Sequence, residues 1–485
     1  MKKTKNTYKS KDKKVNKKRE VKQQHLRSEG GKRGIKEQVE LKCITMNEEG
    51  KGIAKHSGSE VIVPGLVKGE KAIVELTRRR GFYTGTVVKM IESSKDRVTP
   101  PCPHYDKCGG CQLQHLSYDG QAAYKKETVE KLMSKFGPTN DILKMDSPFE
   151  YRNKSHATFG EDKRGKVISG IYQEYSHRLI PIEKCMIQDP LADAIVNTIR
   201  DMMPSFRMRA FNEDYGKGFL RHVLVRKGFN SGEVMVVLVV TEHKFQGKNN
   251  FVKALLKAHP EITTIVMNIN ERNTSLVLGN AEKVLYGKGR ISDTLCETRF
   301  SLSPKSFYQI NPPQTERLYK KSIEMAKLTG KELVVDAYSG IGTISLVLAK
   351  NAKEVIGVEL NRDAVKDAKF NAKANNITNV QFVQDDAGAF MVKLAEQNEK
   401  IDVVFMDPPR SGSDERFLAS VAKLSPKKVV YISCNPHTQK RDLEYMVGRG
   451  YKVKEIQPVD MFPQTFHVEN IVLLEKESTP KKIRR

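Results

Sequence analysis

The sequence predicts a multidomain protein that ends in a doubly wound α/β domain. From about residue 305, short apolar strands alternate with helical segments, which is typical of a mainly parallel sheet. Residues 37–95 contain about five short strands separated by Gly and Pro, which favours a small β-barrel. Residues 96–304 mix strands and helices and predict an α+β central domain. A length of 485 residues suits two to four domains of roughly 100–200 residues each.

The C-terminal domain is expected over residues 305–476, and a short basic tail over 477–485. Apolar runs with β-branched residues predict its strands. The predicted strands are 332–336, 355–359, 380–383, 403–407, 429–433 and 471–475.

The charge balance points to a polyanionic partner. Lys and Arg number 84 against 58 Asp and Glu, a net charge of +26. Residues 1–36 contribute a net +12 and hold few apolar side chains, so they predict a disordered basic extension. The remaining +14 lies in the folded part. The extension is either a nucleic-acid tether or a solubilising segment.

Several protein classes are excluded. The chain has no apolar run of about 18 residues that would span a membrane, and no apolar segment follows the basic N-terminus as in a secretory signal. Seven Cys among 485 residues do not make a disulfide scaffold. A reducing, cytoplasmic location is therefore expected, with clustered Cys acting as metal ligands.

A glycine-rich turn predicts a nucleotide-like cofactor site. The first C-terminal strand ends at Asp336 and runs into a turn containing Gly340 and Gly342. An acid before the turn repels a pyrophosphate but suits a cationic amino acid, which favours S-adenosylmethionine over a dinucleotide. Glu359 ends the next strand, where an acid can accept ribose hydroxyls, and Asp386 follows the third strand.

A nucleophile and a base are predicted near strand ends. Cys434 follows the fifth strand and precedes Asn-Pro, so it lies at the expected ligand crevice. A thiolate that adds to C6 of uracil makes C5 nucleophilic toward a methyl sulfonium, and a base then removes the C5 proton. Glu469 is the candidate base, and His467 is its rival because its ordinary pKa suits neutral pH. Asp407 begins Asp-Pro-Pro-Arg, in which Arg410 stands where amino-group methyltransferases carry Tyr.

Four cysteines form a candidate metal site. Cys102, Cys108 and Cys111 lie close together in a Gly-containing loop, and Cys185 follows 74 residues later. Their spacing fits either tetrahedral zinc or a [4Fe–4S] cluster. Cys43 and Cys296 match no site and are expected in the core.

Together these motifs resemble the RumA-type uracil-5-methyltransferases of ribosomal RNA. The resemblance covers residues 37–475. The matching motifs are Cys102…Cys108-Gly-Gly-Cys111…Cys185, Ser306-Phe-Tyr-Gln-Ile-Asn311, Asp407-Pro-Pro-Arg410, Ser433-Cys-Asn-Pro436 and His467-Val-Glu-Asn470.

The resemblance implies a TRAM domain at residues 37–95 and a [4Fe–4S] cluster on Cys102, Cys108, Cys111 and Cys185. It implies Cys434 as the nucleophile and Glu469 as the base. It also places Phe307 near the target base, whereas the sequence alone predicts a core residue. The implied S-adenosylmethionine contacts are Gln309, Tyr338, Glu359, Asp386 and Asp407.

The predicted function is S-adenosylmethionine-dependent formation of 5-methyluridine in 23S ribosomal RNA, by a monomer with no membrane or obligate protein partner. The alternatives are a transfer-RNA uracil-5-methyltransferase and a non-catalytic RNA-binding assembly factor. A DNA cytosine-5-methyltransferase is disfavoured, because Ser433 rather than Pro precedes Cys434.

Overall fold

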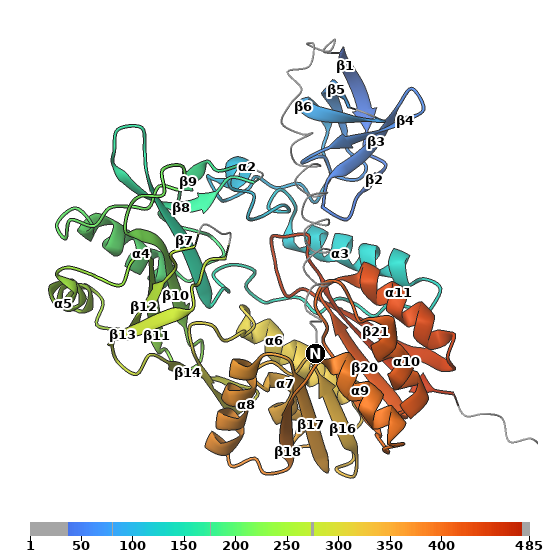
Figure 1. Ribbon diagram of the computed structural model, residues 1–485. Coiled ribbons are helices and arrows are strands. Elements are labelled where there is room, and N and C mark those ends of the chain that lie inside the picture. The colour runs from blue at the N-terminus through green and yellow to red at the C-terminus, as the bar shows by residue number, and fades with distance from the viewer. Residues whose placement is uncertain (1–36, 80, 175, 273–275, 478–485) are drawn as a thin grey trace, which may run out of the picture. The chain divides into compact units, whose positions relative to one another are not determined.

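The computed structural model describes residues 37–79, 81–174, 176–272 and 276–477 (Figure 1). The predicted extension at residues 1–36 and all but the first residue of the predicted tail lie outside the described residues. The chain divides into two compact units between Lys95 and Asp96. No helix in the described ranges combines the length and apolar character that a membrane span requires.

The first unit is a six-stranded sheet in the order β1-β5-β6-β4-β3-β2. Apart from the parallel pair β4–β6, its neighbours are antiparallel. From Lys71 to Leu76 every second side chain of β5 is buried, so one face of this stretch packs into an apolar core that includes Cys43, as expected. The strands are β1 (Glu37–Lys42), β2 (Thr45–Met46), β3 (Gly52–His56), β4 (Ser59–Val63), β5 (Lys71–Arg79) and β6 (Phe82–Glu92).

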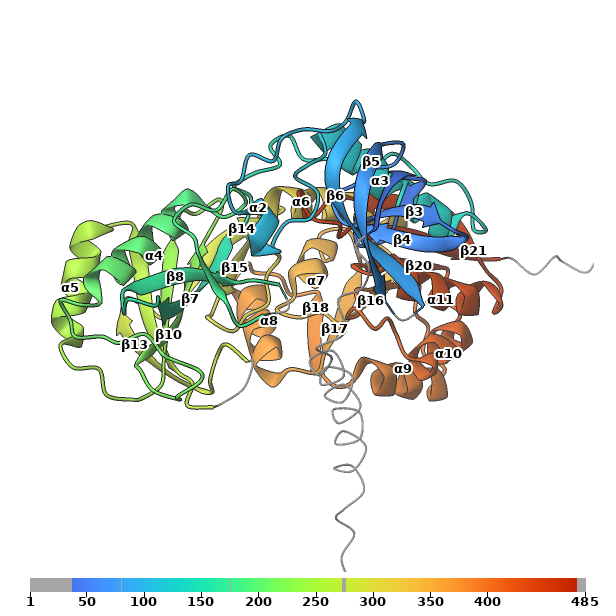
Figure 2. The ribbon, with the colours of Figure 1, turned by 90° about the horizontal axis from the view of Figure 1, so that it is seen from above.

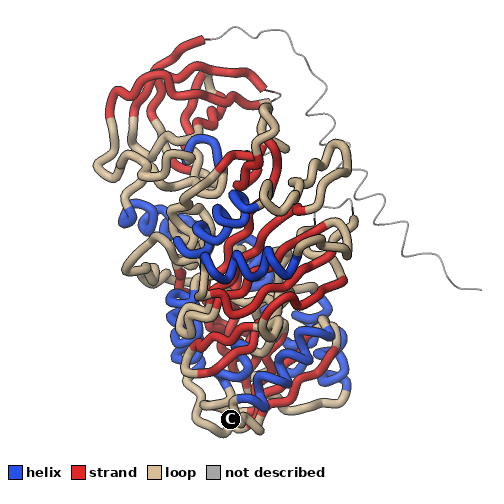
Figure 3. Tube along the Cα trace, turned by 90° about the vertical axis from the view of Figure 1, so that its left-hand side faces the viewer, coloured by secondary structure: helices blue, strands red, loops and turns tan. Residues whose placement is uncertain are grey.

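The second unit begins with a helical segment and a seven-stranded central sheet in the order β13-β12-β11-β10-β7-β8-β9. Helices α4 and α5 pack against one face of this sheet (Figures 1 and 3). The bounds are α2 (Tyr105–Cys108), α3 (Tyr118–Met133), β7 (Lys154–Glu161), β8 (Val167–Tyr172), β9 (Leu179–Pro181), α4 (Pro190–Met202), β10 (Leu220–Lys227), β11 (Val234–Val240), α5 (Lys248–Ala258), β12 (Ile262–Ile269) and β13 (Ala281–Tyr286).

A hairpin, β14 (Ile291–Leu295) and β15 (Thr298–Leu302), leads into the C-terminal sheet, which lies beside the central one (Figures 1 and 2). Its order is β18-β17-β16-β19-β20-β22-β21. The bounds are α6 (Pro312–Ala326), β16 (Leu333–Ala337), α7 (Thr343–Leu348), β17 (Glu354–Glu359), α8 (Arg362–Ala374), β18 (Val380–Gln384), α9 (Ala387–Glu396), β19 (Val403–Met406), α10 (Glu415–Leu424), β20 (Lys428–Ser433), α11 (Pro436–Val447), β21 (Tyr451–Val459) and β22 (Glu469–Lys476).

Both faces of the C-terminal sheet are buried, which explains the continuous apolar runs of its strands. Val334 packs with residues of α6, α7 and α8, while its neighbour Val335 packs with residues of α9, α10 and α11. The five strands from β16 to β20 are parallel, and β22 returns antiparallel to β20. The predicted doubly wound α/β architecture is confirmed for this part of the chain.

Helix α3, which the sequence assigned to the central domain, packs into the core of the C-terminal sheet. Its residues Val129 and Met133 share a buried cluster with β20 and α11. The Nζ of Lys125 lies 2.5 Å from Oδ1 of Asp460, and both side chains are fully buried. Burial lowers the pKa of Lys125, and the carboxylate of Asp460 opposes this shift. The helix is thus attached to the C-terminal sheet by apolar packing and by one buried ion pair.

Replacing Lys125 by Met leaves the Asp460 carboxylate buried without its cation. We expect this to lower the free energy of unfolding by about 3–5 kcal/mol, measured by urea denaturation. The double variant Lys125→Met/Asp460→Leu removes both charges and should recover much of the loss. Lys126 on the same helix pairs with an exposed carboxylate, so Lys126→Met should leave stability unchanged. Equal losses of stability in Lys125→Met and Lys126→Met would contradict a special role for the buried ion pair.

Candidate active site and four-cysteine site

The predicted site residues follow the sheet order along one edge. The carboxyl ends of parallel strands meet at that edge, where open α/β sheets bind ligands. Chain order reverses at β16, which lies between β17 and β19. On one side of this switch point lie Glu359, the last residue of β17, and Asp386, which follows β18. On the other side lie Asp407 and Cys434, which follow β19 and β20. Tyr338 follows β16 itself.

The antiparallel strand β22 brings Glu469 beside Cys434. Ser433, the last residue of β20, pairs with Asn470, so the residues that flank this pair are neighbours at the strand end. Cys434 is partly exposed, whereas the Glu469 side chain is buried. Asp407 follows Met406, which pairs with Tyr431 of β20. A thiol and two carboxyl groups therefore share one end of the sheet.

This grouping shifts the proton affinity of all three residues. Burial, together with the charges of Glu469 and Asp407, raises the pKa of Cys434 to about 11. Burial also raises the pKa of Glu469, with Asp407 adding to the shift, and burial raises the pKa of Asp407. In the free protein, two nearby buried carboxyl groups hold protons more tightly than exposed ones do.

Arg410 supplies the cation that opposes these shifts. Its charge lowers the pKa of both Cys434 and Glu469. Its backbone carbonyl accepts hydrogen bonds from Nδ2 of Asn435 at 3.0 Å and from Oγ1 of Thr438 at 3.2 Å. The sequence noted Arg410 only as a replacement for Tyr. Its place in the same four-residue motif as Asp407 is the signal in the sequence that points to it.

His467 is a weaker base candidate than Glu469. Burial, together with the charges of Arg410 and Lys125, lowers the pKa of His467 to about 4. Its ring packs against Phe466 with centroids 4.2 Å apart. A buried imidazole with so low a pKa holds a proton poorly at neutral pH, which favours the carboxyl group.

The glycine-rich turn after β16 has a backbone conformation that lets a ligand approach it closely. Tyr338 has a φ of +68°, an uncommon left-handed conformation for a residue with a side chain. Its hydroxyl lies 3.3 Å from Oγ of Ser413. Gly342 has a φ of +84°, and a Cβ there would lie 2.7 Å from the Phe382 ring, so the turn requires glycine. The backbone N–H of Gly340 donates to Glu359 Oε2 at 3.0 Å, which joins turn and acid.

Asp336, at the base of the turn, is a fully buried carboxyl group. Its Oδ2 accepts a hydrogen bond from Ser345, while its Oδ1 has no partner within the described ranges. Burial raises the pKa of Asp336 to about 7, with Asp407 and Glu359 adding to the shift. A cationic ligand group near this acid cluster would relieve the mutual repulsion. Asp386 caps α9 by accepting from the Ala389 N–H, and it pairs with Arg416 at 3.2 Å.

The motif from Ser306 to Asn311 alternates between inward and outward side chains. Tyr308 is buried and its hydroxyl donates to Asp293 at 3.3 Å, while Asn311 caps α6. Phe307 is 70% exposed, so the expectation of a core residue from sequence alone is wrong. It points outward because its neighbours on both sides supply the buried contacts. Gln309 is partly buried, and its carbonyl accepts from Asn153 Nδ2 at 3.0 Å.

The four predicted metal ligands lie together. Cys102, Cys108, Cys111 and Cys185 line one small cavity of about 50 Å³. Burial, together with the charges of the other three thiols, raises the pKa of Cys111 to about 12. Among the described residues, no three His, Cys, Asp or Glu side chains already have a geometry that would hold a metal ion.

The cavity also contains a cation that the sequence did not single out. Arg152 lines it, and its buried Nε has no hydrogen-bond partner within the described part of the chain. A guanidinium beside four thiols suits a group that is anionic when bound. Arg152 reaches the cavity from the segment before β7, and only the folded structure brings it there.

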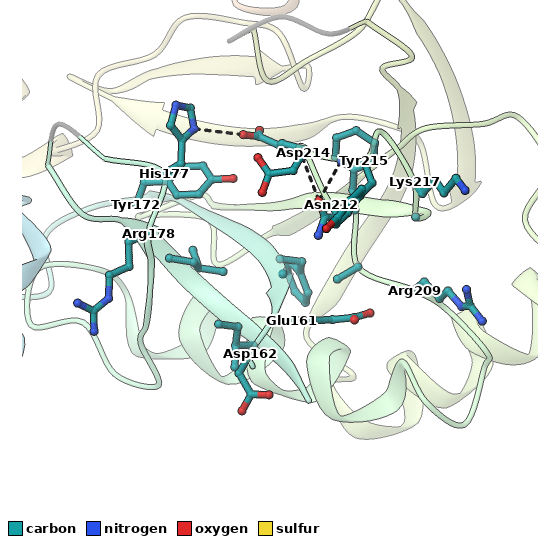
Figure 4. A pocket seen from close by; sticks show the side chains of 18 of the residues that line it. Glu161, Asp162, Tyr172, His177, Arg178, Arg209, Asn212, Asp214, Tyr215 and Lys217 are labelled. Carbon is teal, nitrogen blue, oxygen red and sulfur yellow. Dashed lines mark hydrogen bonds and ion pairs between the residues drawn. The ribbon is translucent and has the colours of Figure 1, made fainter. Parts of the chain in front are cut away.

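A second, open cavity of about 920 Å³ lies over one end of the central sheet (Figure 4). His177 Nδ1 lies 3.6 Å from Glu213 Oε2 across it, and the Tyr172 ring packs edge-on against His177. Its lining mixes Arg178, Arg209 and Lys217 with acidic side chains and includes none of the predicted site residues. It is separate from the strand-end site.

Comparison with known proteins assigns the family. Residues 117–477 match the family described as tRNA (uracil-5-)-methyltransferase. An uncharacterized RNA methyltransferase of Caldanaerobacter subterraneus subsp. tengcongensis is 42% identical over 447 residues, covering 91% of this chain and 99% of the relative. One from Halalkalibacterium halodurans is 42% identical over 443 residues, covering 90% and 96%.

A solved structure agrees with these matches. The Pyrococcus abyssi tRNA (uracil-54, C5)-methyltransferase in complex with S-adenosyl-L-homocysteine has a TM-score of 0.73 and 26% identity. The alignment covers 90% of this chain and 99% of the other. Since the family match spans most of the C-terminal and central sheets, the resemblance seen in the motifs is confirmed: the chain belongs to the tRNA (uracil-5-)-methyltransferase family of S-adenosylmethionine-dependent RNA methyltransferases.

Proposed function

We propose that this enzyme methylates C5 of a uridine in 23S ribosomal RNA, with Cys434 as the nucleophile and Glu469 as the base. The observation that carries the proposal is the β20–β22 register, which sets Glu469 next to Cys434 at the ligand-binding edge of the sheet. The target uridine must leave its stack for C6 to reach the thiol.

The reaction balances with these two side chains. The Cys434 thiolate adds to C6 of uracil, and the electron pair moves to C5 as an enolate. C5 attacks the sulfonium methyl group, forming a C–C bond and breaking the S–CH₃ bond to leave S-adenosylhomocysteine. The Glu469 carboxylate then takes the C5 proton, and elimination breaks the Cys434–C6 bond to restore the aromatic ring and the thiolate.

Gln309, Tyr338, Glu359, Asp386 and Asp407 are the proposed contacts to S-adenosylmethionine. The free Oδ1 of buried Asp336 and the surrounding acids fit a ligand with a net positive charge. Glu359 joins the glycine-rich turn to the second strand, where an acid suits ribose hydroxyls. Phe307, whose side chain is exposed, suits stacking on the target base.

The four-cysteine cavity is proposed to hold a [4Fe–4S] cluster. Four converging thiols fit this group or a tetrahedral zinc ion, and Arg152 adds the positive charge that an anionic cluster favours. The bound group would link the loop of Cys102–Cys111 covalently to the segment at Cys185. Its proposed role is structural, because methyl transfer needs no redox step.

RNA affinity is proposed to come from the basic N-terminal region. The first unit would be a TRAM domain, and the net charge of +26 suits phosphate contacts that weaken with salt. Together with the four cysteines, this region favours 23S RNA. Transfer RNA is the second candidate, since the solved relative is named for it. The presence of both Cys434 and Glu469 argues against a non-catalytic assembly factor. The monomeric state and cytoplasmic location stay predictions.

The substrate is tested by methyl transfer from labelled S-adenosylmethionine to unmodified 23S RNA and to transfer RNA, side by side. We expect label in 5-methyluridine from 23S RNA, identified by mass spectrometry, and its loss in Cys434→Ala. Label in transfer RNA alone would support the proposed chemistry but identify transfer RNA, not 23S RNA, as the substrate. Transfer that persists in Cys434→Ala would overturn the nucleophile.

The raised pKa values predict a rising pH profile. Cys434 and Glu469 act in their ionised forms, and burial keeps both protonated at low pH. We expect kcat/KM to increase from pH 6 to 9, by up to about 100-fold per unit while both groups titrate and about tenfold once one remains. Glu469→Gln should lower kcat by about 10²–10⁴-fold and remove one titration. A flat or falling profile would contradict these roles.

Metal analysis tests the four-cysteine site. Anaerobically purified protein should contain about four iron and four sulfide per chain, and Cys185→Ser should lose both. Cys296→Ala is the matched control, because Cys296 is a buried thiol outside the cavity. About one zinc per chain without sulfide would replace the cluster with a zinc site.

A further inference from the structure

The loop that leads to the proposed base is hydrogen-bonded to residues that lie outside the C-terminal sheet. Residues 460–468, here called the base loop, connect β21 to β22 and lead directly into Glu469. The loop has no regular secondary structure, yet Asp460, Met461 and Gln464 are buried. Buried backbone polar groups need partners, so whatever bonds to this loop fixes its course.

Gln464 is the residue on which these contacts converge. It has a φ of +71°, a conformation that a residue with a side chain keeps only when its surroundings hold it there. Its carbonyl accepts the backbone N–H groups of Gln112 at 2.9 Å and Leu113 at 3.0 Å. Cys111, a predicted metal ligand, comes directly before Gln112. The residue that follows Cys111 in the sequence therefore bonds directly to the base loop.

Gln121 on α3 completes the attachment. Its Oε1 accepts the backbone N–H of Gln464 at 2.9 Å, and its Nε2 donates to the Gln464 side-chain oxygen at 2.9 Å. Both side chains are almost fully buried. One amide side chain thus fixes the backbone and the side chain of Gln464 together. Tyr151 adds a bond from its hydroxyl to the Pro463 carbonyl at 3.0 Å.

We infer that Gln121 and Gln464 are positioning residues, which hold Glu469 in place by fixing the base loop against the segment that follows the four-cysteine site. The inference rests on the proposed function, because it takes Glu469 as the base. Neither residue touches the reacting atoms. Their loss should affect the step that needs Glu469 and spare the steps that need only Cys434 and the methyl donor.

RNA containing 5-fluorouridine separates these steps. Addition of Cys434 and methyl transfer do not require a base, but a C5–F bond cannot be broken by proton abstraction, so a covalent protein–RNA adduct remains. The rate of adduct formation therefore reports the early steps. Turnover on ordinary uridine also reports the removal of the C5 proton.

The test compares Gln121→Leu with the parent protein in both assays. We expect turnover on uridine to fall about 10- to 100-fold, as for a misplaced catalytic group, while adduct formation with 5-fluorouridine RNA stays within about twofold. Gln121→Glu keeps the acceptor for the Gln464 N–H and should recover most of the turnover. Gln381→Leu is the matched control, because Gln381 is an exposed amide on β18 that bonds Glu354, and it should behave like the parent.

The outcomes are distinguishable. Equal losses in both assays, or no loss in either, would overturn the positioning role. Absence of an adduct with the parent protein would instead overturn the proposed chemistry. If Gln121→Leu does not fold, Gln464→Gly provides the second variant, since glycine accepts the positive φ and removes only the side-chain bonds, to Gln121 and to the Pro148 carbonyl. The same difference between the two assays is expected there, and its absence would refute the inference.

Discussion

The antiparallel pairing of β22 with β20 is the constraint on which the candidate site depends. A purely parallel sheet presents only residues that follow its strands. Here β22 runs in the opposite direction and begins with Glu469 at the edge where β20 ends before Cys434. A shift of one residue in this register would turn Glu469 to the other face of the sheet. The proposed pairing of nucleophile and base is thus a property of strand register.

The region before the central sheet serves the C-terminal sheet as well. Helix α3 supplies apolar side chains and Lys125 to the C-terminal core, and residues 112 and 113 bond to the base loop. The four-cysteine cavity combines one loop from this region with Cys185, which precedes α4. Segments distant in sequence are therefore linked around the site, so that the fold of one supports the geometry of another.

Much of the fold was predictable because local patterns determine it. The predicted C-terminal strands, including the last one, agree with the observed strands within one or two residues at each end. Spacing alone places Cys102, Cys108 and Cys111 close together, whereas the fold brings Cys185 to the same cavity. Continuous apolar runs do not reveal strand β21, where polar residues interrupt the run. The attachment of α3 depends on contacts with residues more than 300 positions away in the sequence. Phe307 was predicted as core because hydrophobicity alone does not show which way a loop side chain points.

The acid cluster around the glycine-rich turn has a consequence for the end of the reaction. The charges of Asp407 and Glu359 add to the raised pKa of buried Asp336, so a cation near these acids is stabilised. In the proposed reaction the methyl donor enters with a sulfonium charge and leaves as a neutral thioether. The transfer therefore removes the charge that the acids attract, and the attraction weakens in the same step that completes the bond. The site would thus release its spent donor more readily than it releases the fresh one.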